Sequence, residues 1–511
     1  MSLLRDGEAV VTAALAAIAD CNPFLPQRID LERRALGDCF VEGGAVWHAE
    51  GDQAALSPNL DRLRALAEHL GEELRGRLAS GADATPLEIC SYQGLVRYVI
   101  FARYEEPWFS LLESTPGNAL RENVDFYEAF ANDTRHFLHF PRRKLIDESE
   151  IEHLFALGFQ IRRAFHQIFR QIFGGSLPAA RLRATVWQSI FTHDFPRYRS
   201  DLYDRMDDIP TLITGESGTG KELVARAIAL SRYIPFEPRK KRFAADHSSM
   251  MNAVNLSALT PTLIESELFG HRRGAFTGAH EDRKGWLEAC GRYGAVFIDE
   301  IGELEESIQV KLLRVLQTRA FQRIGETQAR HFDGKVIAAT NRDLSREIET
   351  GRFRKDLYYR LCADQVRTPT LREQLADSPD DLGNLIRILV RRVVCEEEVT
   401  RLCDEVGTWL RTHIPQEYPW PGNMRELEQC VRSVLIRGEY HPQATASGAG
   451  DDFAALFGTG QATVDELIQR YCRLVYEQTG SYQETARRIG LDRRTVKARI
   501  EAIPEADEKE E

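Results

Sequence analysis

Residues 215–222 form a glycine-rich segment whose residue types suit phosphate binding. The segment consists of Gly215, Glu216, Ser217, Gly218, Thr219, Gly220, Lys221 and Glu222. Glycines allow backbone N–H groups to converge on phosphate oxygens, and the N-terminal end of a following helix adds positive potential. Lys221 is expected to reach the β- and γ-phosphates of a nucleotide. Glu222 departs from the usual pattern, because Ser or Thr normally ligates Mg²⁺ there, and a simple glycine-rich turn is the alternative.

An acidic pair, Asp299-Glu300, follows the apolar run Ala295–Ile298 further along the chain. In a parallel sheet, a strand end of this kind lies beside the phosphate loop. Asp299 would then hold Mg²⁺, and Glu300 would orient and polarise an attacking water. A solvated acidic turn is the alternative for the pair taken alone, but the phosphate loop that precedes it favours a nucleotide site.

Two further segments carry polar groups that suit phosphoryl transfer. The run Val336–Thr340 is followed by Asn341, so Thr340 and Asn341 would lie near the γ-phosphate or its water. Arg354 and Arg360 could neutralise charge on the transferred phosphoryl group, an effect on the order of 10³–10⁵ in rate. If a neighbouring subunit supplies this arginine, the site lies between subunits. A strand entering a turn and a solvated basic helix face are the alternatives for these segments taken alone.

A parallel sheet is the element that would bring these residues together. Short β-prone runs alternate with helical stretches at residues 211–214, 253–256, 295–298 and 336–340. Buried strands that alternate with helices predict an α/β fold with both faces of the sheet covered. Residues 371–438 and residues 1 to about 170 have helical patterns instead.

The overall composition is that of a globular chain of several domains. It has 511 residues, 43% of them hydrophobic, and a net charge of −12, which excludes a protein coated in basic residues. The nine cysteines form no Cys-x-x-Cys pair, so neither a disulfide framework nor a zinc cluster is predicted. No apolar run is long enough to span a bilayer, and the first residues lack a convincing signal cleavage site. We therefore expect a cytoplasmic protein without membrane association.

Residues 174–438 resemble the bacterial enhancer-binding proteins, the AAA+ activators that act on RNA polymerase carrying sigma-54. Besides the motifs above, this segment contains the hexapeptide Gly274, Ala275, Phe276, Thr277, Gly278 and Ala279. The resemblance implies that the hexapeptide is a surface loop that inserts into sigma-54 and changes position with nucleotide state. Its glycines permit a tight turn, so we expect Phe276 and Thr277 at an exposed tip. An ordinary hairpin turn is the alternative.

The resemblance also implies roles that spacing alone does not give. Asn255 would be a switch asparagine that pairs with the catalytic Glu300, and Arg425 would report nucleotide state from a helical lid. ATP and Mg²⁺ are the implied cofactors, and the family tolerates glutamate at the position of Glu222. The chain departs from the family in two segments, 191–210 and 236–253, which are longer than usual.

The segment 482–500 has the pattern of a helix-turn-helix. Ala486 is small where two helices would cross, and Gly490 suits the turn. The contacts between the helices would come from Ile489, Leu491, Val496 and Ile500. The second helix would enter the major groove, and the expected DNA-binding residues are Arg487, Arg488, Arg493, Arg494, Thr495, Lys497 and Arg499. The segment resembles the Fis-type module of this family, and a solvated charged hairpin is the alternative.

Residues 1–170 give no readable signal. They lack the acidic pair and the alternating β/α pattern of a phosphorylatable receiver. His136 with His139, and His153 with Glu150 and Glu152, could line a metal or ligand site. Ordinary surface or packing histidines are the stronger interpretation.

These observations predict five segments and one function. The segments are a helical regulatory domain (1–170), an AAA+ α/β ATPase and sigma-54 interaction subdomain (171–370), a helical lid (371–440), a linker (441–462), and a helix-turn-helix with an acidic tail (463–511). We expect an ATP-dependent activator that binds upstream DNA, assembles into a ring, expected to be a hexamer, and remodels sigma-54 RNA polymerase. A DNA-binding regulator or repressor with the AAA+ fold as oligomerisation switch, and an AAA+ remodeller of other substrates, are the alternatives.

Overall fold

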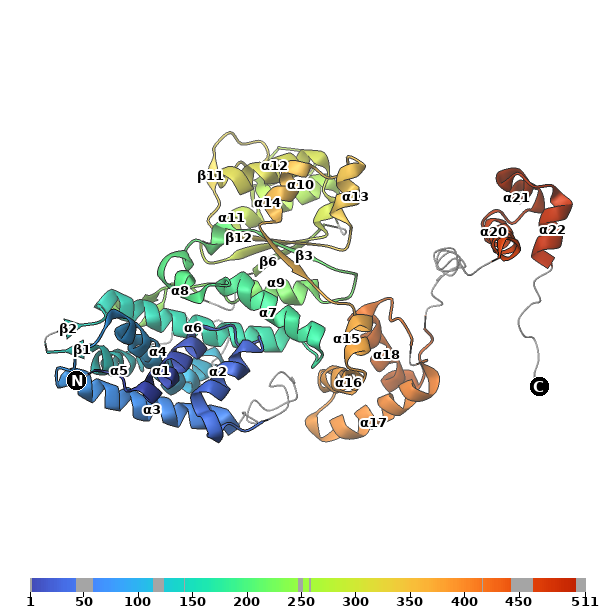
Figure 1. Cartoon of the computed structure of the whole chain (residues 1–511). Coiled ribbons are helices and arrows are strands. Elements are labelled where there is room, and N and C mark those ends of the chain that lie inside the picture. The colour runs from blue at the N-terminus through green and yellow to red at the C-terminus, as the bar shows by residue number, and fades with distance from the viewer. Residues whose placement is uncertain are drawn as a thin grey trace. The chain divides into compact units, whose positions relative to one another are not determined.

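The computed structural model describes residues 2–42, 58–113, 124–141, 143–246, 251–256, 259–415, 417–442 and 463–501. The chain divides into two compact units, Met1–Ile436 and Arg437–Glu511 (Figure 1). Most of the predicted linker and the whole acidic tail fall outside the described residues.

A five-stranded parallel sheet forms the centre of the first unit. Its strands, in spatial order, are β13 (Asp364–Arg367), β3 (Thr211–Thr214), β12 (Lys335–Thr340), β9 (Ala295–Asp299) and β6 (Met251–Asn255). Four of these strands are the β-prone runs of the sequence, so the predicted α/β fold with a parallel sheet is confirmed. The order places β3 between β12 and β13, which puts the glycine-rich segment after β3 at the carboxyl edge of the sheet, flanked by a strand on each side.

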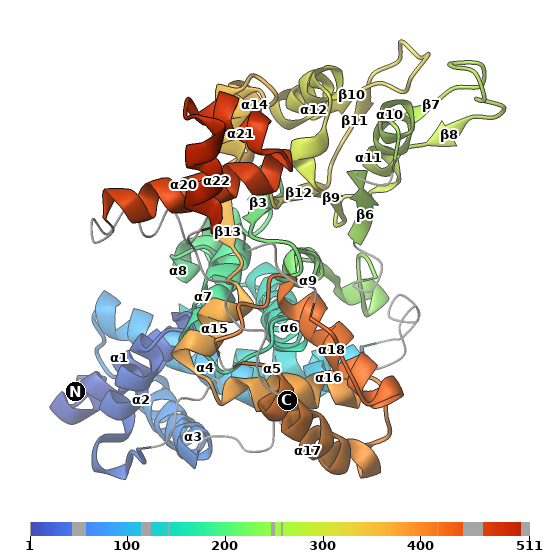
Figure 2. The same ribbon diagram turned by 90° about the vertical axis from the view of Figure 1, so that its right-hand side faces the viewer.

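Helices cover both faces of this sheet (Figures 1 and 2). On one face, α6 (Glu148–Gln171), α7 (Leu177–Phe191) and α9 (Lys221–Ala229) pack against side chains such as Ile213, Phe297 and Ile337. On the other face, α10 (Pro261–Phe269), α12 (Glu306–Thr318) and α14 (Lys355–Leu361) pack against Leu212, Val296 and Val336. Burial of strand residues on two apolar faces is why the inner strands β3, β12 and β9 are rich in apolar residues, whereas the edge strand β13 buries only Val366.

The N-terminal region is mainly helical, as predicted. It contains α1 (Asp6–Asp20), α2 (Gln27–Leu36), α3 (Pro58–Ala79), α4 (Pro86–Glu113) and α5 (Tyr127–Leu138), with a short hairpin of β1 (His139–Phe140) and β2 (Arg143–Lys144). Aromatic side chains, including Trp108, Phe130 and Phe155, fill its core.

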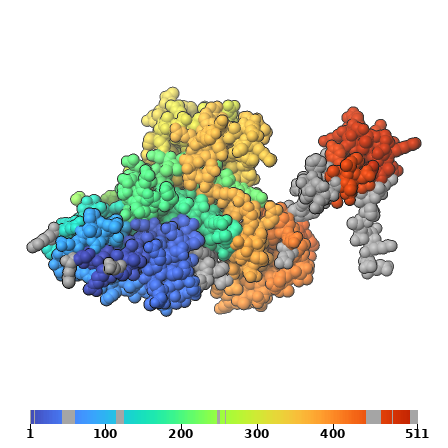
Figure 3. Space-filling model, in the orientation of Figure 1, coloured from blue at the N-terminus to red at the C-terminus, as the bar shows by residue number. Residues whose placement is uncertain are grey.

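Helix α6 belongs to two cores at once. Phe155 and Phe159 lie in the N-terminal core, whereas Ile161 and Ile168 lie in the core beneath the sheet. The N-terminal helices and the sheet therefore form one continuous body within Met1–Ile436 (Figure 3).

The N-terminal core also receives a hairpin from the sheet region. Strands β4 (Phe236–Glu237) and β5 (Arg242–Phe243) pair in antiparallel fashion. The Phe236 ring lies 4.7 Å from that of Tyr127, and the Phe243 ring lies 4.3 Å from that of Phe159. Residues 236–243, within the segment 236–253, thus form a hairpin that packs against the N-terminal helices.

Shorter elements complete this unit. They are α8 (Phe195–Arg197), β7 (Gly270–His271), β8 (Arg283–Lys284), α11 (Trp286–Ala289), β10 (Ala320–Phe321), β11 (Arg330–His331) and α13 (Leu344–Glu349). Four helices follow β13, as the helical pattern predicts: α15 (Leu371–Asp377), α16 (Asp381–Arg391), α17 (Glu396–His413) and α18 (Asn423–Arg437).

The second unit contains three described helices, α20 (Val464–Thr479), α21 (Tyr482–Ile489) and α22 (Arg493–Glu501). Ala486 and Val496 are buried between them, as expected, together with Cys472 and Val475. Leu491 differs from its prediction, because it is exposed in the turn after α21 rather than packed between the helices. No helix in the described part of the chain is both long and apolar enough to cross a membrane.

Candidate functional site

The glycine-rich segment 215–222 joins β3 to α9 and is closely enclosed by the rest of the fold. Gly218 has a φ of 78°, and a Cβ built there would lie 2.2 Å from the carbonyl oxygen of Gly422. A Cβ on Gly215 would lie 2.0 Å from Oγ1 of Thr368. Glycine is therefore required at both positions by the close approach of other segments.

Lys221 begins α9 and folds back over the loop. Its Nζ donates to the carbonyl oxygens of Gly215 (2.9 Å) and Glu216 (3.1 Å), and lies 4.0 Å from Oε1 of Glu300. Burial lowers the pKa of Lys221, while the Glu300 and Asp299 carboxylates oppose that shift. The ammonium group is thus already aimed at the space above the loop where phosphate oxygens would sit.

The acidic pair at the end of β9 lies beside this lysine, as the sequence predicts for a strand end of the sheet. Burial, and next the adjacent Glu300 carboxylate, raise the pKa of Asp299. Glu300 adopts a left-handed conformation (φ 55°), and its Oε2 accepts a hydrogen bond from the backbone N–H of Asn341 (3.1 Å). The ends of β9 and β12 are therefore held together by the Glu300 side chain.

Asn255, at the end of β6, contacts a different carboxylate from the one expected. Its Nδ2 donates to Oδ2 of Asp299 at 3.3 Å, whereas the resemblance implied pairing with Glu300. The parallel register of β6 and β9 pairs Asn255 directly with Asp299, which explains the difference. Thr340 is fully buried and its Oγ1 accepts from the N–H of Arg342, so this hydroxyl caps the turn after β12.

Three other predicted residues do not join this cluster within the same chain. Glu222 is exposed on α9 and pairs with Arg226 at 3.4 Å. Arg354 pairs with Asp356 (2.8 Å) and Glu306 (3.4 Å) on the far side of the sheet. Arg360 is exposed at the C-terminal end of α14.

The start of α18 closes over the glycine-rich loop. Nη1 of Arg425 donates to Oγ of Ser217 at 3.2 Å. Asn423 makes more contacts: its Nδ2 donates to Glu216 Oε2 (3.1 Å) and Ser217 O (3.0 Å), and its Oδ1 accepts from Leu371 N (2.8 Å). The sequence analysis predicted Arg425 but missed Asn423, whose left-handed φ of 52° is the kind of backbone position that asparagine favours.

Thr368 is a second residue that the sequence analysis missed. It is buried just after β13, and its Oγ1 lies 2.7 Å from Oγ1 of Thr219 and donates to Thr214 O (3.3 Å). A single threonine after an edge strand carries no sequence signal of its own. Its position beside β3 follows from the strand order β13-β3-β12.

The hexapeptide 274–279 forms a closed turn between β7 and β8, which Figure 2 shows extending away from the sheet. The N–H of Gly274 donates to Ala279 O (2.8 Å), and the N–H of Ala279 donates to Phe276 O (3.0 Å). Thr277 is exposed, as expected. Phe276 is only half-exposed, because its ring packs edge-on against the buried His271 at 5.0 Å.

His271 ties this turn to α10. Its Nδ1 lies 2.7 Å from Oγ of Ser266. The preceding chain runs from Asn255 at the end of β6 through α10 to β7. Asn255, which donates to Asp299, therefore lies at the start of the stretch of chain that leads to the turn.

The basic residues of the second unit lie mainly on its surface. Arg487, Arg488, Arg493, Arg494 and Lys497 are exposed. Asp492 caps α22 by accepting from the N–H groups of Arg494 (2.9 Å) and Thr495 (3.0 Å). Arg499 differs from this set, because it is half-buried and pairs with Asp465 at 2.9 Å.

The histidines of the N-terminal region serve packing and hydrogen bonding. Nε2 of His136 lies 3.2 Å from the carboxylate of Glu72, and Nε2 of His139 lies 3.0 Å from Ile146 O. Nδ1 of His153 lies 2.8 Å from the hydroxyl of Tyr233, and burial lowers the pKa of this imidazole. Within the described ranges, no group of three His, Cys, Asp or Glu side chains is placed to hold a metal ion.

Comparisons with known proteins show what the sheet region is similar to. Residues 197–367 match the model of the sigma-54 interaction domain. The transcriptional regulatory protein ZraR of Escherichia coli (strain K12) is 39% identical over 303 residues, which cover 57% of this chain and 62% of ZraR. The Nif-specific regulatory protein of Azotobacter vinelandii is 38% identical over 305 residues, 57% of this chain and 54% of that protein.

The similarity is therefore partial on both sides, since the chain spans 62% and 54% of the lengths of these two relatives. Among solved structures, the crystal structure of NtrX from Brucella abortus in complex with ATP aligns with a TM-score of 0.40 and 22% identity. That alignment covers 75% of this chain and 82% of the NtrX chain.

Proposed function

We propose that this chain is a sigma-54-dependent transcription activator that uses ATP hydrolysis, a proposal supported by the match of residues 197–367 to the sigma-54 interaction domain. The observation that carries this proposal is the pairing of two features in one domain. A phosphate loop faces an acidic strand end, and the segment that leaves Asn255 ends in the exposed turn 274–279.

The residues around the loop support ATP binding. Backbone N–H groups of residues 215–221 and the ammonium group of Lys221 would bind the phosphates. Lys221 already lies 2.9 Å from Gly215 O, so a triphosphate would replace the carbonyls as its partner. Arg425 and Asn423 reach the same loop from α18, which would let the lid respond to the nucleotide.

The acidic pair fits a divalent cation. Glu300 Oε1 lies 4.0 Å from the ammonium group of Lys221, and burial, followed by the adjacent Glu300 carboxylate, raises the pKa of Asp299. Asp299 would hold Mg²⁺, which would supply charge neutralisation for the β- and γ-phosphates. Glu222, on the same helix as Lys221, is exposed and pairs with Arg226, so it is not one of the carboxylates assigned to Mg²⁺.

Glu300 would act as the base that orients and polarises the attacking water. The N–H of Asn341 fixes one of its oxygens, which leaves the other directed toward Lys221 and the phosphate position. Hydrolysis would change the charge beside Asp299, and the hydrogen bond from Asn255 would pass that change to β6, α10 and the turn.

Arg354 and Arg360 lie away from the phosphate loop of their own chain, so we propose that they act on a neighbouring subunit. A head-to-tail interface of this kind closes into a ring. Arg360 is the better of the two candidates, because it is exposed, whereas Arg354 is engaged with Asp356 and Glu306.

The second unit would bind upstream DNA through α22. Replacement of Arg494 by glutamine should weaken binding to all duplexes and lower the slope of log K against log salt by about one, as loss of one phosphate contact does. An unchanged slope would remove Arg494 from the interface. Arg499 is a matched comparison, since its ion pair with Asp465 assigns it to the fold of this unit.

A sigma-54-dependent transcription assay with purified protein tests the central proposal. Thr277→Val should retain ATP turnover but abolish open-complex formation, because the turn would no longer engage sigma-54. Thr400→Val, an exposed threonine on α17, is the matched control and should retain both activities. Full activation by Thr277→Val would contradict the proposal, and transcriptional repression by the native chain would favour the regulator alternative.

A further inference from the structure

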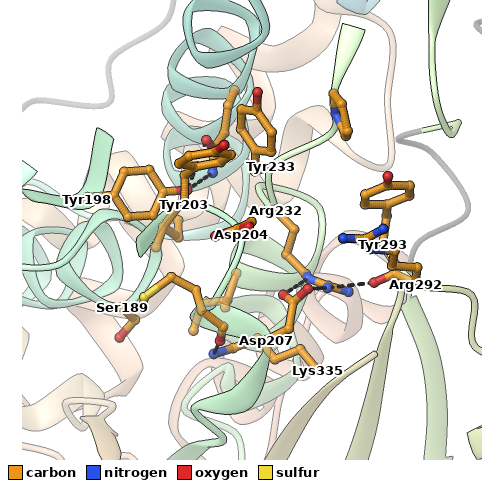
Figure 4. A pocket seen from close by; sticks show the side chains of 15 residues that line it. Ser189, Tyr198, Tyr203, Asp204, Asp207, Arg232, Tyr233, Arg292, Tyr293 and Lys335 are labelled. Carbon is orange, nitrogen blue, oxygen red and sulfur yellow. Dashed lines mark hydrogen bonds and ion pairs between the residues drawn. The ribbon is translucent and has the colours of Figure 1, made fainter. Parts of the chain in front are cut away.

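A cavity of about 230 Å³ lies at the opposite edge of the sheet from the phosphate loop. Figure 4 shows four tyrosine side chains around it: Tyr198, Tyr203, Tyr233 and Tyr293. Lys335, the first residue of β12, also lines the cavity. The amino ends of parallel strands meet at this edge, so the cavity is separated from the nucleotide site by the length of the strands.

Several separate parts of the chain meet at the cavity. Helices α6 and α7 contribute Gln160 and Ser189, and the segment 198–207 contributes one wall. The turn after α9, the residues 292–293 and β12 contribute the rest. The segment 198–207 lies within residues 191–210, the stretch expected from the sequence to be longer than in related chains.

The tyrosine rings form flat walls that other contacts hold in place. The Tyr198 hydroxyl donates to Gln160 Oε1 at 3.0 Å, and the Tyr233 hydroxyl lies 2.8 Å from Nδ1 of His153. The Tyr203 ring packs against Tyr233 at 4.7 Å and against His153 at 4.2 Å. These contacts fix aromatic rings in the cavity wall, where an aromatic ligand could stack on them or pack edge-on against them.

The deepest charged group in the cavity is an ammonium group. Lys335 is 2% exposed, and its Nζ donates to the carbonyl oxygens of Ile209 (2.5 Å) and Met206 (3.3 Å). An ammonium group has three donors, and no third acceptor lies within hydrogen-bond distance among the described residues. Burial lowers the pKa of Lys335 to about 8, so an anionic partner here would restore a fully charged ammonium group.

The Asp364 carboxylate raises the pKa of Lys335 but does not outweigh the effect of burial. Asp364 already accepts hydrogen bonds from Ser189 (3.1 Å) and Thr211 (2.7 Å). Arg232 donates to Asp207 (2.9 Å) and to Arg292 O (2.9 Å), as Figure 4 shows, so the charges of Arg232 and Asp207 compensate each other. Arg292 is exposed, with its guanidinium group 5.7 Å from the centre of the Tyr293 ring. Asp204 is exposed to solvent, which screens its charge from the interior.

We propose that this cavity binds a small aromatic carboxylate, with the ring between the tyrosines and the carboxylate on Lys335. The volume is suitable, because a cavity of about 150 Å³ accommodates benzene, and the additional space admits a carboxylate group. The buried lysine provides an anchor for the charge, and Arg292 lies at the mouth.

Two elements connect this cavity directly to the nucleotide site. Helix α9 has Lys221 at its first residue and Ile228, a cavity residue, near its last. Strand β12 has Lys335 at its first residue and Thr340, beside the acidic pair, at its last. A ligand that shifts either element at the cavity would therefore shift groups at the phosphate loop, so the cavity is an effector site. This coupling rests on the proposed ATPase activity, whereas ligand binding does not.

Titration calorimetry on the full chain tests the binding with benzoate as the probe. Benzoate should bind one site per chain, and benzamide, which has the same shape without the charge, should bind at least about tenfold more weakly. Cyclohexanecarboxylate tests the aromatic walls and should also bind more weakly. Equal binding of all three compounds, or no binding of benzoate, would overturn the proposal.

Variants locate the site. Lys335→Met keeps the length of the side chain and should weaken benzoate binding about tenfold. Arg292→Gln changes an exposed residue that does not support the core and should weaken binding by a smaller factor. Arg181→Gln, an exposed arginine on α7, is the matched control and should bind benzoate as the native chain does. Benzoate binding that neither cavity variant weakens would place the ligand elsewhere and overturn the proposal.

The effector role has its own readout. ATP turnover by the native chain should change on addition of benzoate and stay constant on addition of benzamide at the same concentration. If benzoate binds in the calorimeter but ATP turnover does not change, the coupling is overturned and the binding site stands. Absence of ATP turnover under all conditions would instead count against the proposed function.

Discussion

Glu300 lies where a general base for ATP hydrolysis would lie, with one carboxylate oxygen fixed by the N–H of Asn341 at 3.1 Å. Glu300→Gln keeps the shape and this hydrogen bond but cannot polarise water. We expect ATP binding to persist and turnover to fall by about 10²–10⁴-fold, as measured by phosphate release and equilibrium nucleotide binding. Glu303→Gln, an exposed neighbour paired with Arg342, should retain turnover. Near-native turnover in Glu300→Gln would remove this residue from catalysis.

A substitution at Gly218 tests the contact between the phosphate loop and the helices that follow β13. Gly218→Ala places a Cβ 2.2 Å from the carbonyl oxygen of Gly422, so the variant should open this contact and weaken ATP binding. Gly351→Ala is a matched control: its φ of 75° is nearly the same as the 78° of Gly218, but no atom lies within 4 Å of the new Cβ. Both variants should lose about 1 kcal/mol of unfolding free energy from backbone strain.

Nucleotide titrations and denaturant unfolding of the two variants separate these effects. The additional loss in Gly218→Ala measures the contact with the lid. Equal stability and equal ATP affinity in the two variants would show that this contact contributes nothing.

At the residue scale, the sequence predicts those side chains whose positions follow from strand ends. Lys221, Asp299 and Glu300 meet because the strands that carry them are parallel, and their motifs indicate this. Asn423 and Thr368 could not be predicted from local patterns. Asn423 contacts Ser217 and Thr368 contacts Thr219, so each reaches the loop from a segment about 150–200 residues away in sequence. The hydrogen-bond partner of Asn255 depends on the register between β6 and β9, which cannot be derived from the sequence.

At the scale of elements, helix α6 has to fit two cores, and Gly158 marks the place where the fit is closest. A Cβ on Gly158 would lie 2.1 Å from the buried Trp108 ring. Gly158→Ala should therefore reduce the free energy of unfolding by about 1–3 kcal/mol, the range for an overpacked core. Urea unfolding followed by tryptophan fluorescence measures this loss.

A second helical glycine provides the control. Gly76 lies in α3 with open space around its Cβ position. Gly76→Ala should raise the stability by up to about 1 kcal/mol, because alanine is favoured over glycine in helices. A stabilising effect of Gly158→Ala would mean that Trp108 does not occupy the position described.

The four strands with continuous apolar runs and the helices of the lid could be predicted, because their periodicity is local. The hairpin β4–β5 could not, since Phe236 and Phe243 are ordered by Tyr127 and Phe159 of a distant helical region. Leu491 was expected in the core of the second unit, but the left-handed Gly490 ends α21 and directs the next residue to solvent. Turn geometry, rather than hydrophobicity, decides that position.

At the scale of the whole molecule, the location of Arg360 leads to a prediction about assembly. The residue is exposed and lies apart from the phosphate loop of its own chain. If it completes the site of a neighbour, Lys221→Ala and Arg360→Ala remove different halves of each shared site. Each variant alone should have almost no ATP turnover.

An equal mixture of these two variants should recover about a quarter of the native turnover, because one interface in four joins an intact loop to an intact arginine. A mixture of Lys221→Ala with Glu300→Gln is the control: both defects lie in the same half of the site, so no interface is restored. Phosphate release at a concentration where the native chain assembles measures both mixtures. Recovery in the control alone, or in neither mixture, would mean that Arg360 does not complete the site of another subunit.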